Sequence, residues 1–364
     1  MNIHEIARHL KFSPSTISRA LNPAKQHLIS AEVRERIQDY ARRMKFVPSS
    51  AARELTTGKT HHIGVIVPTA FDSFFFNDHL TKILEGVYKV LAERGSYRCK
   101  LIIIPPGQNF GDLDEEIRGH RIDGLLVSAL SNHLMYSSYY YPKDFLANWN
   151  KPVMLVGIKL KSSKHLSYAH SDNFEAARKA ITYLLRKGYR RIAMIQQVPE
   201  VPDARERLKG YLAALKDHRI EVRENLIVKG RMDLKEERRL HPPPLTTDAH
   251  NLYPIERGYK ITLGLFEPGG PKPTAIFCAN DETALGALRA LRFLGMRSPQ
   301  DVAVMGFDGL DAGELVDPRL STVKQPTFEM AEWGTRALLD MIEGKIKGPV
   351  SRLFTMPLLL RDSA

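Results

Sequence analysis

Two groups of side chains in this sequence have the types and spacing to do chemistry, and that chemistry is recognition. The stretch SPSTISRALN at 13–22 places hydroxyls, an amide and a guanidinium in one short segment. Elsewhere, polar residues stand where apolar, strand-like runs end: Asp308 follows VAVMGF, and Asn280 and Asp281 follow IFCA. Such groups form directional hydrogen bonds, so they can bind bases, phosphates or the hydroxyls of a small molecule.

The motifs of common enzyme classes are missing from the chain. No G-x-G-x-x-G follows the first strand-like run, no G-x-x-x-x-G-K-[ST] occurs, and no nucleophile elbow is present. The two cysteines, Cys99 and Cys278, are too few for a cysteine-ligated zinc site, and both lie in apolar runs that predict buried free thiols. We therefore expect no catalytic residues, no enzyme activity, no metal and no cofactor.

The composition is that of an ordinary globular protein. The chain has 364 residues, of which 43% are apolar and 26% charged, enough for two to three domains. Its apolar runs, such as 63–68 and 101–106, are far shorter than the ~20 residues that a membrane helix needs. Glu5 and Arg8 argue against a secretory signal. We therefore expect a cytoplasmic protein without membrane contact.

Positive charge is concentrated at the amino terminus. Residues 1–61 carry eleven Lys and Arg against five Asp and Glu, a net charge of +6, and the rest of the chain supplies only the other half of the total +12. A small basic module on a nearly balanced body indicates an anionic partner. A solvated basic face is the alternative that charge alone leaves open.

The first sixty residues have the pattern of three short helices. Asn2 with Glu5 is similar to a capping box, Ser13 followed by Pro14 begins a second helix, and Ser30 caps a third. Their apolar residues recur at helical spacing: Ile3, Ile6, Ala7 and Leu10; then Ile17, Ala20 and Leu21; then Val33, Ile37, Ala41 and Met44. Two short helices joined by a tight turn and supported by a third predict a helix-turn-helix.

Beyond residue 61, strand-like runs alternate with helical stretches. The expected strands are 62–67, 100–104, 123–128, 153–157, 191–195, 225–228, 275–278 and 302–306. The expected helices are 78–94, 174–187, 204–216, 256–266, 281–294 and 329–342. Repeated strand–helix units predict mostly parallel sheets covered on both faces, and a body of about 300 residues predicts two lobes.

These patterns resemble the LacI/GalR family of bacterial transcription regulators. The resemblance is carried by IHEIA at 3–7, SPSTISRALN at 13–22 and PSSAAREL at 48–55. It implies an all-α helix-turn-helix DNA-binding domain at 1–47, a hinge helix and linker at 48–61, and an α/β body at 62–364. That body is expected to be periplasmic-binding-protein-like, with two Rossmann-like lobes. One lobe covers about 62–168 plus 325–354, and the other about 169–324 plus 355–364.

By this resemblance, the helix 13–21 enters the major groove of DNA. The positions that face bases in the family are occupied here by Pro14, Ser15 and Arg19. The residues able to bind phosphates are Thr16, Ser18 and Asn22, with capping and solvation as the alternative for the last two. Arg19 can make two hydrogen bonds to a guanine. Lys11 stands at a turn position where the family often has glycine, so a positive φ is expected there.

The segment 48–55 matches the hinge helix of the family. It is too short to be stable alone, so it is expected to fold when two copies meet on DNA. Leu55 matches the leucine that wedges between base pairs in the minor groove and kinks the duplex. Ala51 and Ala52 are small enough for close approach to the groove. A flexible linker is the alternative.

The resemblance also implies an effector site between the lobes. Asp308 and Arg207 match effector-binding residues of the family, with a lobe-bridging salt bridge as their alternative role. Further candidates are Ser73, Phe74, Phe75, Asp172, Asn280 and Asp281. Helix capping is the alternative for the last three, and core or cleft lining for the phenylalanines. The chain departs from the family at Gly157, where a carboxylate is expected, and at 231–257, a longer Pro-rich stretch that is either a surface loop or a cover for the cleft.

The chain is therefore interpreted as a homodimeric, sequence-specific transcriptional repressor. Its expected partners are a near-palindromic double-stranded DNA operator and a small-molecule effector, a carbohydrate or derivative. A solute-binding sensor is the first alternative, and the basic amino-terminal module argues against it. An enzyme on a Rossmann-like body is the second, and the missing motifs argue against it.

Overall fold

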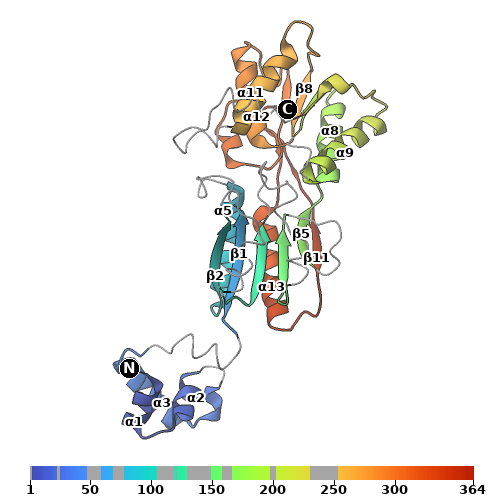
Figure 1. Ribbon diagram of the computed structural model, residues 1–364. Coiled ribbons are helices and arrows are strands. Elements are labelled where there is room, and N and C mark those ends of the chain that lie inside the picture. Colours follow the sequence, from blue (N-terminus) through green and yellow to red (C-terminus); the bar gives the residue numbers. More distant parts are fainter. Residues whose placement is uncertain are drawn as a thin grey trace. The chain divides into compact units, whose positions relative to one another are not determined.

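The computed structural model describes residues 2–22, 25–46, 59–68, 78–104, 119, 121–128, 149–157, 166–196, 202–229 and 253–364. The chain divides into two compact units (Figure 1). The first is Met1–His61 with Arg121–Asp123, and the second is His62–His120 with Gly124–Ala364. None of the described helices is long and apolar enough to cross a membrane.

The first unit is a small helical bundle. Its elements are α1 (Ile3–Leu10), α2 (Pro14–Leu21), the 3-10 turn η1 (Gln26–Leu28) and α3 (Ala31–Arg43). The predicted capping box of α1 is present, and Lys11 ends that helix with a φ of 55°. Each helix places its small apolar face in one core: Ile6, Ala7, Ile17, Ala20 and Ile37 are buried there. One prediction is wrong: α3 begins after Ser30, but the Ser30 side chain makes no capping hydrogen bond.

The first sheet of the second unit is parallel throughout, in the order β11-β5-β4-β3-β1-β2. Its strands are β1 (His62–Pro68), β2 (Arg98–Ile104), β3 (Gly124–Ser128), β4 (Val153–Val156), β5 (Ser167–Ser171) and β11 (Ser351–Phe354). Two helices, α5 (Asp78–Arg94) and α13 (Thr327–Ile342), pack against each other and onto this sheet (Figure 1). The predicted parallel arrangement is therefore confirmed for this lobe.

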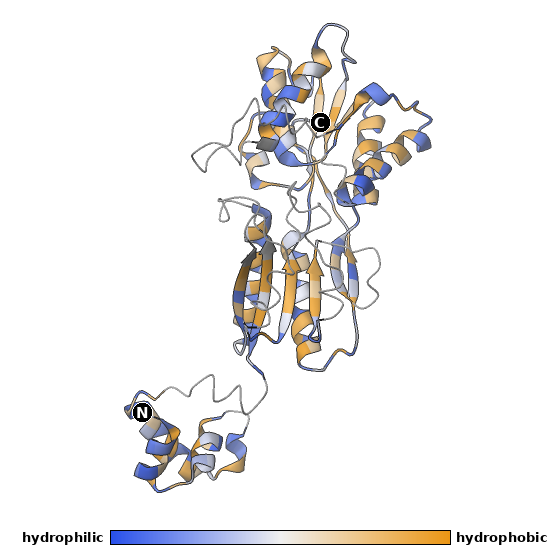
Figure 2. Cartoon of the chain, in the orientation of Figure 1, coloured by the Kyte–Doolittle hydropathy of each residue, from blue (hydrophilic) through white to orange (hydrophobic). Residues whose placement is uncertain are grey.

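The second sheet is parallel as well, in the order β7-β6-β8-β9. Its strands are β6 (Ile192–Ile195), β7 (Ile227–Val228, after the 3-10 turn η3, Glu224–Leu226), β8 (Ala275–Cys278) and β9 (Ala303–Met305). Alternate residues of each strand face opposite sides, and each side contributes to its own apolar core. Figure 2 colours the strands of this sheet mostly as hydrophobic. One side packs on α8 (Asn173–Arg186) and α9 (Pro202–Asp217), the other on α11 (Tyr253–Phe266) and α12 (Asp281–Phe293).

A close helix contact in this lobe depends on glycine. A Cβ at Gly210 in α9 would lie 2.2 Å from the carbonyl oxygen of Phe174 in α8. That distance is far below a van der Waals contact, so any side chain at this position would push the two helices apart. The α8–α9 pair in turn fixes the position of Arg207, one turn earlier on α9.

The chain passes between the two sheets at three places. After β5 it enters α8, and after β10 (Thr322–Val323), which follows the 3-10 turn η5 (Asp311–Glu314), it enters α13. After β11 it returns to form β12 (Leu358–Leu359), antiparallel to β10. Because β5 belongs wholly to the first sheet, the first passage follows Ser171 rather than residue 168.

The cysteines differ from the sequence expectation. Cys278 is buried in β8, as predicted, but Cys99 is exposed on β2. The strand β2 lies at an edge of the first sheet, and the exposed Leu101 shares the face of Cys99 because side chains alternate along a strand. An apolar run does not distinguish an edge strand from a central one, which explains the error.

Candidate functional site

The helix α2 begins with a local hydrogen-bond network. The Ser13 hydroxyl accepts a hydrogen bond from the Thr16 amide at 3.1 Å, and the two hydroxyls lie 2.9 Å apart. Pro14 is the first residue of the helix. An N–H at that position would have no acceptor inside the helix, so proline removes no helical hydrogen bond there. These contacts define the start of the predicted recognition helix.

The two faces of α2 have opposite character. Ile17 and Ala20 are fully buried in the helical core. The candidate base-contacting residues Pro14, Ser15 and Arg19 are exposed, as is Ser18, while Thr16 and Asn22 are half-buried. Arg19 makes no ion pair with any carboxylate of the described residues. The helix therefore presents hydroxyls and one guanidinium on a face that its own packing does not use.

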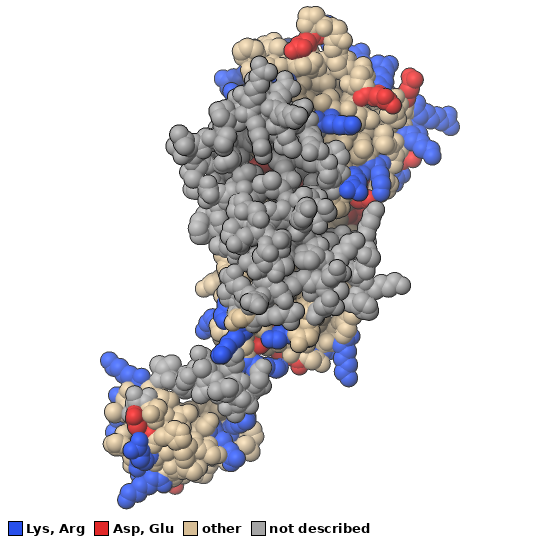
Figure 3. Space-filling model, viewed as in Figure 1, with Lys and Arg blue, Asp and Glu red and all other residues tan. Residues whose placement is uncertain are grey.

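The surroundings of α2 are held in place and positively charged. Gln38 of α3 donates a hydrogen bond to the carbonyl oxygen of Ala20 at 3.2 Å, which fixes the end of α2. Lysine and arginine side chains stand at the surface of this unit (Figure 3). The helix α2 contains no acidic residue. A surface of this charge attracts the phosphates of nucleic acid.

Several predicted site residues lie outside the described residues. They are Ala51, Ala52 and Leu55 of the predicted hinge helix, and Ser73, Phe74 and Phe75 of the predicted effector site. Most of the departure at 231–257 lies outside as well.

In the second lobe, Arg207 is the centre of a buried polar cluster. Its side chain is 3% exposed. Its Nε donates to Asn173 Oδ1 at 2.8 Å, and its Nη1 donates to the carbonyl oxygen of Ala279 and lies 3.5 Å from Asp308 Oδ1. The guanidinium stacks 3.7 Å from the ring centre of Phe307. Arg207 and Asp308 thus pair within one lobe, so the alternative of a lobe-bridging salt bridge is wrong.

Asp308 stands in an unusual backbone conformation. Its φ of 128° is rarely adopted by a residue with a side chain. Gln325 donates to its Oδ1 at 2.6 Å, while no described residue donates to its Oδ2. Burial raises the pKa of Asp308 to about 7, because the nearby Arg207 only partly offsets the loss of solvent. Within the described residues, the polar contacts of this carboxylate with Gln325 and Arg207 are therefore both made by Oδ1.

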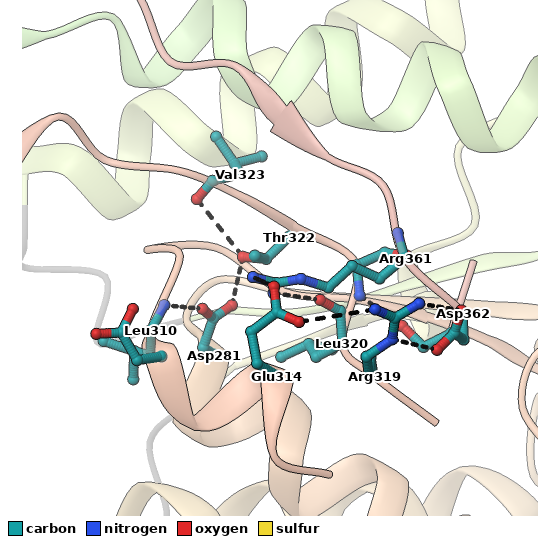
Figure 4. Close-up of polar contacts among 12 residues, drawn as sticks. Asp281, Leu310, Glu314, Arg319, Leu320, Thr322, Val323, Arg361 and Asp362 are labelled. Atoms are coloured by element: carbon teal, nitrogen blue, oxygen red, sulfur yellow. Dashed lines mark hydrogen bonds and ion pairs between the residues drawn. The ribbon is translucent and has the colours of Figure 1, made fainter. Parts of the chain in front are cut away.

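Asp281 has a different environment from Asp308. It is fully buried at the first turn of α12. Its Oδ1 accepts from the Thr322 hydroxyl at 2.5 Å, and its Oδ2 accepts from the Leu310 amide at 2.7 Å (Figure 4). A Cβ at Gly306 would lie 2.1 Å from Oδ1, so glycine is needed there for the carboxylate to fit. Both oxygens are used inside the protein: Oδ2 holds Leu310 in the 306–310 loop that carries Asp308, and Oδ1 holds Thr322 in β10.

Two other predicted contacts cap helices. Asn280 Oδ1 accepts from the Thr283 amide at 3.0 Å, which caps α12. Asp172 Oδ1 accepts from the Glu175 amide at 3.0 Å, which caps α8. The capping alternative is therefore present at both residues.

Sequence reasoning missed three residues of this cluster. Asn173 and Gln325 bind Arg207 and Asp308 directly. Asp203, one turn before Arg207, hydrogen-bonds Asn173, and burial raises the pKa of its carboxyl. A carboxylate one helical turn before a guanidinium on α9 was the available signal for Asp203. Asn173 directly follows the candidate Asp172, which was its available signal, whereas Gln325 has no such signal, because it comes from a distant part of the chain.

The arrangement suits a neutral hydroxylated ligand. The Asp308 carboxylate follows β9, and Asn280 follows β8, at the carboxyl ends of the strands where open parallel sheets bind ligands. The described residues contain no group of three or more His, Cys, Asp or Glu that could hold a metal ion.

Two family models match this chain. Residues 60–241 match the model described as periplasmic binding proteins and sugar binding domain of LacI family. Residues 181–364 match a periplasmic binding protein-like domain.

Relatives align over nearly the whole chain. The HTH-type transcriptional repressor CytR of Escherichia coli (strain K12) is 30% identical over 363 residues, covering 99% of this chain and 95% of CytR. The probable HTH-type transcriptional repressor ExuR of Bacillus subtilis is 26% identical, covering 100% of this chain and 98% of ExuR.

Solved structures have the same fold. The transcriptional regulator CelR–cellobiose complex is 26% identical, with a TM-score of 0.69 and complete coverage of both chains. The lac repressor dimer bound to operator and the anti-inducer ONPF is 19% identical, with a TM-score of 0.77 and coverage of 100% of this chain and 98% of that one.

Proposed function

Because the chain belongs to the LacI family of transcriptional regulators, we propose that it is a repressor that binds operator DNA through α2 and responds to a small-molecule effector. The observation that carries this proposal is the exposed face of α2. Ser15, Ser18 and Arg19 are displayed by a helix whose opposite face is buried and which has no acidic residue. Such a helix can enter the major groove and read base edges.

Selection from a pool of random double-stranded DNA tests this function. We expect the purified full-length protein to enrich a near-palindromic sequence, and its affinity for that sequence to fall steeply with added salt. Enrichment of no sequence, with binding that depends on salt alone, would overturn the proposal. The palindrome would also report a homodimer, since two copies related by a twofold axis read two half-sites.

The segment 48–55 is proposed to pair with its copy in the minor groove. A Leu at position 55 can wedge between base pairs, and Ala51 and Ala52 permit close approach. Leu55→Ala should therefore reduce the bend of the selected DNA, measured by energy transfer between dyes at the two duplex ends. An unchanged bend would assign Leu55 to a plain linker.

The effector is proposed to bind at the Arg207 cluster. Asp308 offers an acceptor to ligand hydroxyls, and Arg207 fixes its orientation. Ser73, Phe74, Phe75, Asp172 and Asn280 complete the proposed site, while Asp281 supports it by holding the loop that carries Asp308. A carbohydrate or derivative fits this chemistry, and the similar CelR is described in complex with cellobiose. A panel of monosaccharides, disaccharides and nucleosides should include a compound that raises the melting temperature of the wild type and not of Asp308→Ala.

We infer further that the chain is not an enzyme and that it works with DNA in the cytoplasm. The relatives that it resembles are transcriptional repressors. Two of the nearby carboxylates are engaged in positioning, since Asp172 caps a helix and Asp281 holds a loop. A hydrolysis assay on the compound that stabilises the wild type should therefore show no turnover.

A further inference from the structure

The carboxylate of Asp123 accepts hydrogen bonds from the two residues at the end of the linker that follows the DNA-binding helices. Asp123 lies immediately before β3 and is 8% exposed. Its Oδ1 accepts hydrogen bonds from the Thr60 amide at 2.9 Å and from the Thr60 hydroxyl at 3.0 Å. Its Oδ2 accepts from the His61 amide at 2.8 Å. Three donors from two consecutive residues thus converge on one side chain.

We call the three hydrogen bonds from Thr60 and His61 to Asp123 the clamp. The backbone beside it includes residues in the left-handed conformation. His61 has a φ of 55° and Arg121 a φ of 47°, both in the left-handed region that residues with a side chain disfavour. The residue between Arg121 and Asp123, Ile122, is 1% exposed, so it anchors its side of the clamp. Hydrogen bonds to a buried carboxylate are stronger than those between neutral groups, and they hold the strained turn.

The clamp joins two neighbouring strands at their amino ends. Thr60 and His61 lead directly into β1, and Asp123 leads directly into β3. These strands are paired in parallel, with Ile63 opposite Gly124. Residues 121–123 belong to the compact unit that contains the DNA-binding helices. Asp123 therefore fixes the backbone of the two residues that lead directly into β1.

We propose that Asp123 is a positioning residue for operator binding, which fixes the point where each subunit's linker begins. This inference rests on the proposed function, because it concerns how the DNA-binding units of two subunits bind two half-sites of one operator. A dimer gains affinity from its second half-site only when its two linkers allow both DNA-binding units to bind at the same time. Loss of the hydrogen bonds that fix the linker should reduce this gain in affinity. It should not change the affinity of one DNA-binding unit for one half-site.

The test compares full-site and half-site binding of the full-length protein. The probes are the sequence selected by the wild type, a duplex with one half-site, and duplexes with the half-sites moved apart by one to three base pairs. For Asp123→Ala we expect about tenfold weaker binding to the full site and unchanged binding to the half-site. We also expect its preference for one half-site spacing to flatten.

Graded variants guard against simple loss of folding. Thr60→Val removes one hydrogen bond without touching the sheet, and should show the same pattern at about two- to threefold. Asp123→Asn keeps one acceptor oxygen and should lie between Thr60→Val and Asp123→Ala. Asp301→Ala is the matched control: it removes a carboxylate that binds the Arg297 amide in the other lobe, and full-site affinity should not change.

Two failures can be told apart. If the wild type selects no sequence, the proposed function is wrong. If the wild type selects an operator and Asp123→Ala keeps its full-site affinity and spacing preference, the inference about Asp123 is wrong while the function stands. Equal loss on full site and half-site would also overturn the inference, since it would show damage to the DNA-binding unit itself.

Discussion

At the scale of single residues, Arg19 is the side chain of α2 with the most to contribute to sequence reading. It is exposed, carries several donors in a fixed fork and has no carboxylate partner among the described residues. We expect Arg19→Ala to lose about 1–3 kcal/mol of discrimination at one base pair of each half-site. Binding to substituted operators measures this. An equal loss on every sequence would instead assign Arg19 to a phosphate.

Asp308 should make stability depend on pH. Burial raises the pKa of Asp308 to about 7 in the folded protein, whereas the pKa of an Asp in the unfolded chain is about 3.9. Between these values the unfolded chain loses the proton and the folded protein keeps it, so the free energy of unfolding falls as pH rises. The slope from one group is at most about 1.4 kcal/mol per pH unit.

Asp308→Asn removes this titration and should flatten the fall in unfolding free energy between pH 4 and pH 7. Urea unfolding at a series of pH values measures the slope. Glu282 provides a matched variant, because burial raises its pKa to about 7 as well. Glu282→Gln should reduce the slope as well. Because burial also raises the pKa of Asp203 and Asp281, some slope should remain, and only a slope equal to that of the wild type in both variants would show that neither carboxyl is protonated in the folded protein.

At the scale of elements, the start of α2 depends on the Ser13 hydroxyl. It satisfies the Thr16 amide, one of the donors that the first helical turn leaves free. Ser13→Ala should therefore cost about 1 kcal/mol in the stability of the helical unit. Hydrogen exchange of amides in α1, α2 and α3 of the full-length protein reports it. Ser15→Ala, on the exposed side of the same turn, should leave this exchange unchanged.

The elements that the sequence predicts well are those with local signals. The bounds of α5 are those expected from its apolar spacing, and the caps at Asn2, Ser13 and Asn280 form as their residue types indicate. The strands β5 and β11 were missed. In β5, SYAHS mixes polar and apolar residues, and β11 is an edge strand in which only Phe354 is buried. Their pairing of Ser351 with Tyr168 joins distant parts of the chain, which no local pattern reveals.

In the candidate site, too, contacts between residues distant in the sequence could not be predicted from local patterns. Arg207 and Asp308 are recognisable because they lie in motifs, but their partners Asn173 and Gln325 come from other elements. The residue type at Asp281 indicates a cap or a ligand group. Only the folded chain shows that both its oxygens turn inward, to Thr322 and Leu310. Side-chain direction at a strand end depends on which distant segment passes beside it.

At the scale of the whole molecule, the last residues of the chain complete the lobe that carries the candidate effector site. The returning segment forms β12 beside β10, and beyond it Arg361 pairs with Glu314 at 2.5 Å and Asp362 with Arg319 at 2.7 Å (Figure 4). Ser363 is fully buried. Its hydroxyl donates to the Val304 carbonyl oxygen at 2.6 Å and accepts from the Ser321 amide at 2.8 Å.

Ser363→Ala should therefore weaken this lobe from a position remote in sequence. The change leaves the Ser321 amide and the Val304 carbonyl buried without their partner, which costs about 1–3 kcal/mol. Because Ser321 leads through Thr322 to Asp281 and the 306–310 loop, we expect faster amide exchange in β9, β10 and that loop. Amides of α1, α2 and α3 should exchange as in the wild type, because those helices form a core of their own. Ser351→Ala, at an exposed serine of β11, is the control. Equal acceleration in every element would mean that the chain unfolds as one cooperative body, and that the carboxyl-terminal segment does not stabilise its lobe separately.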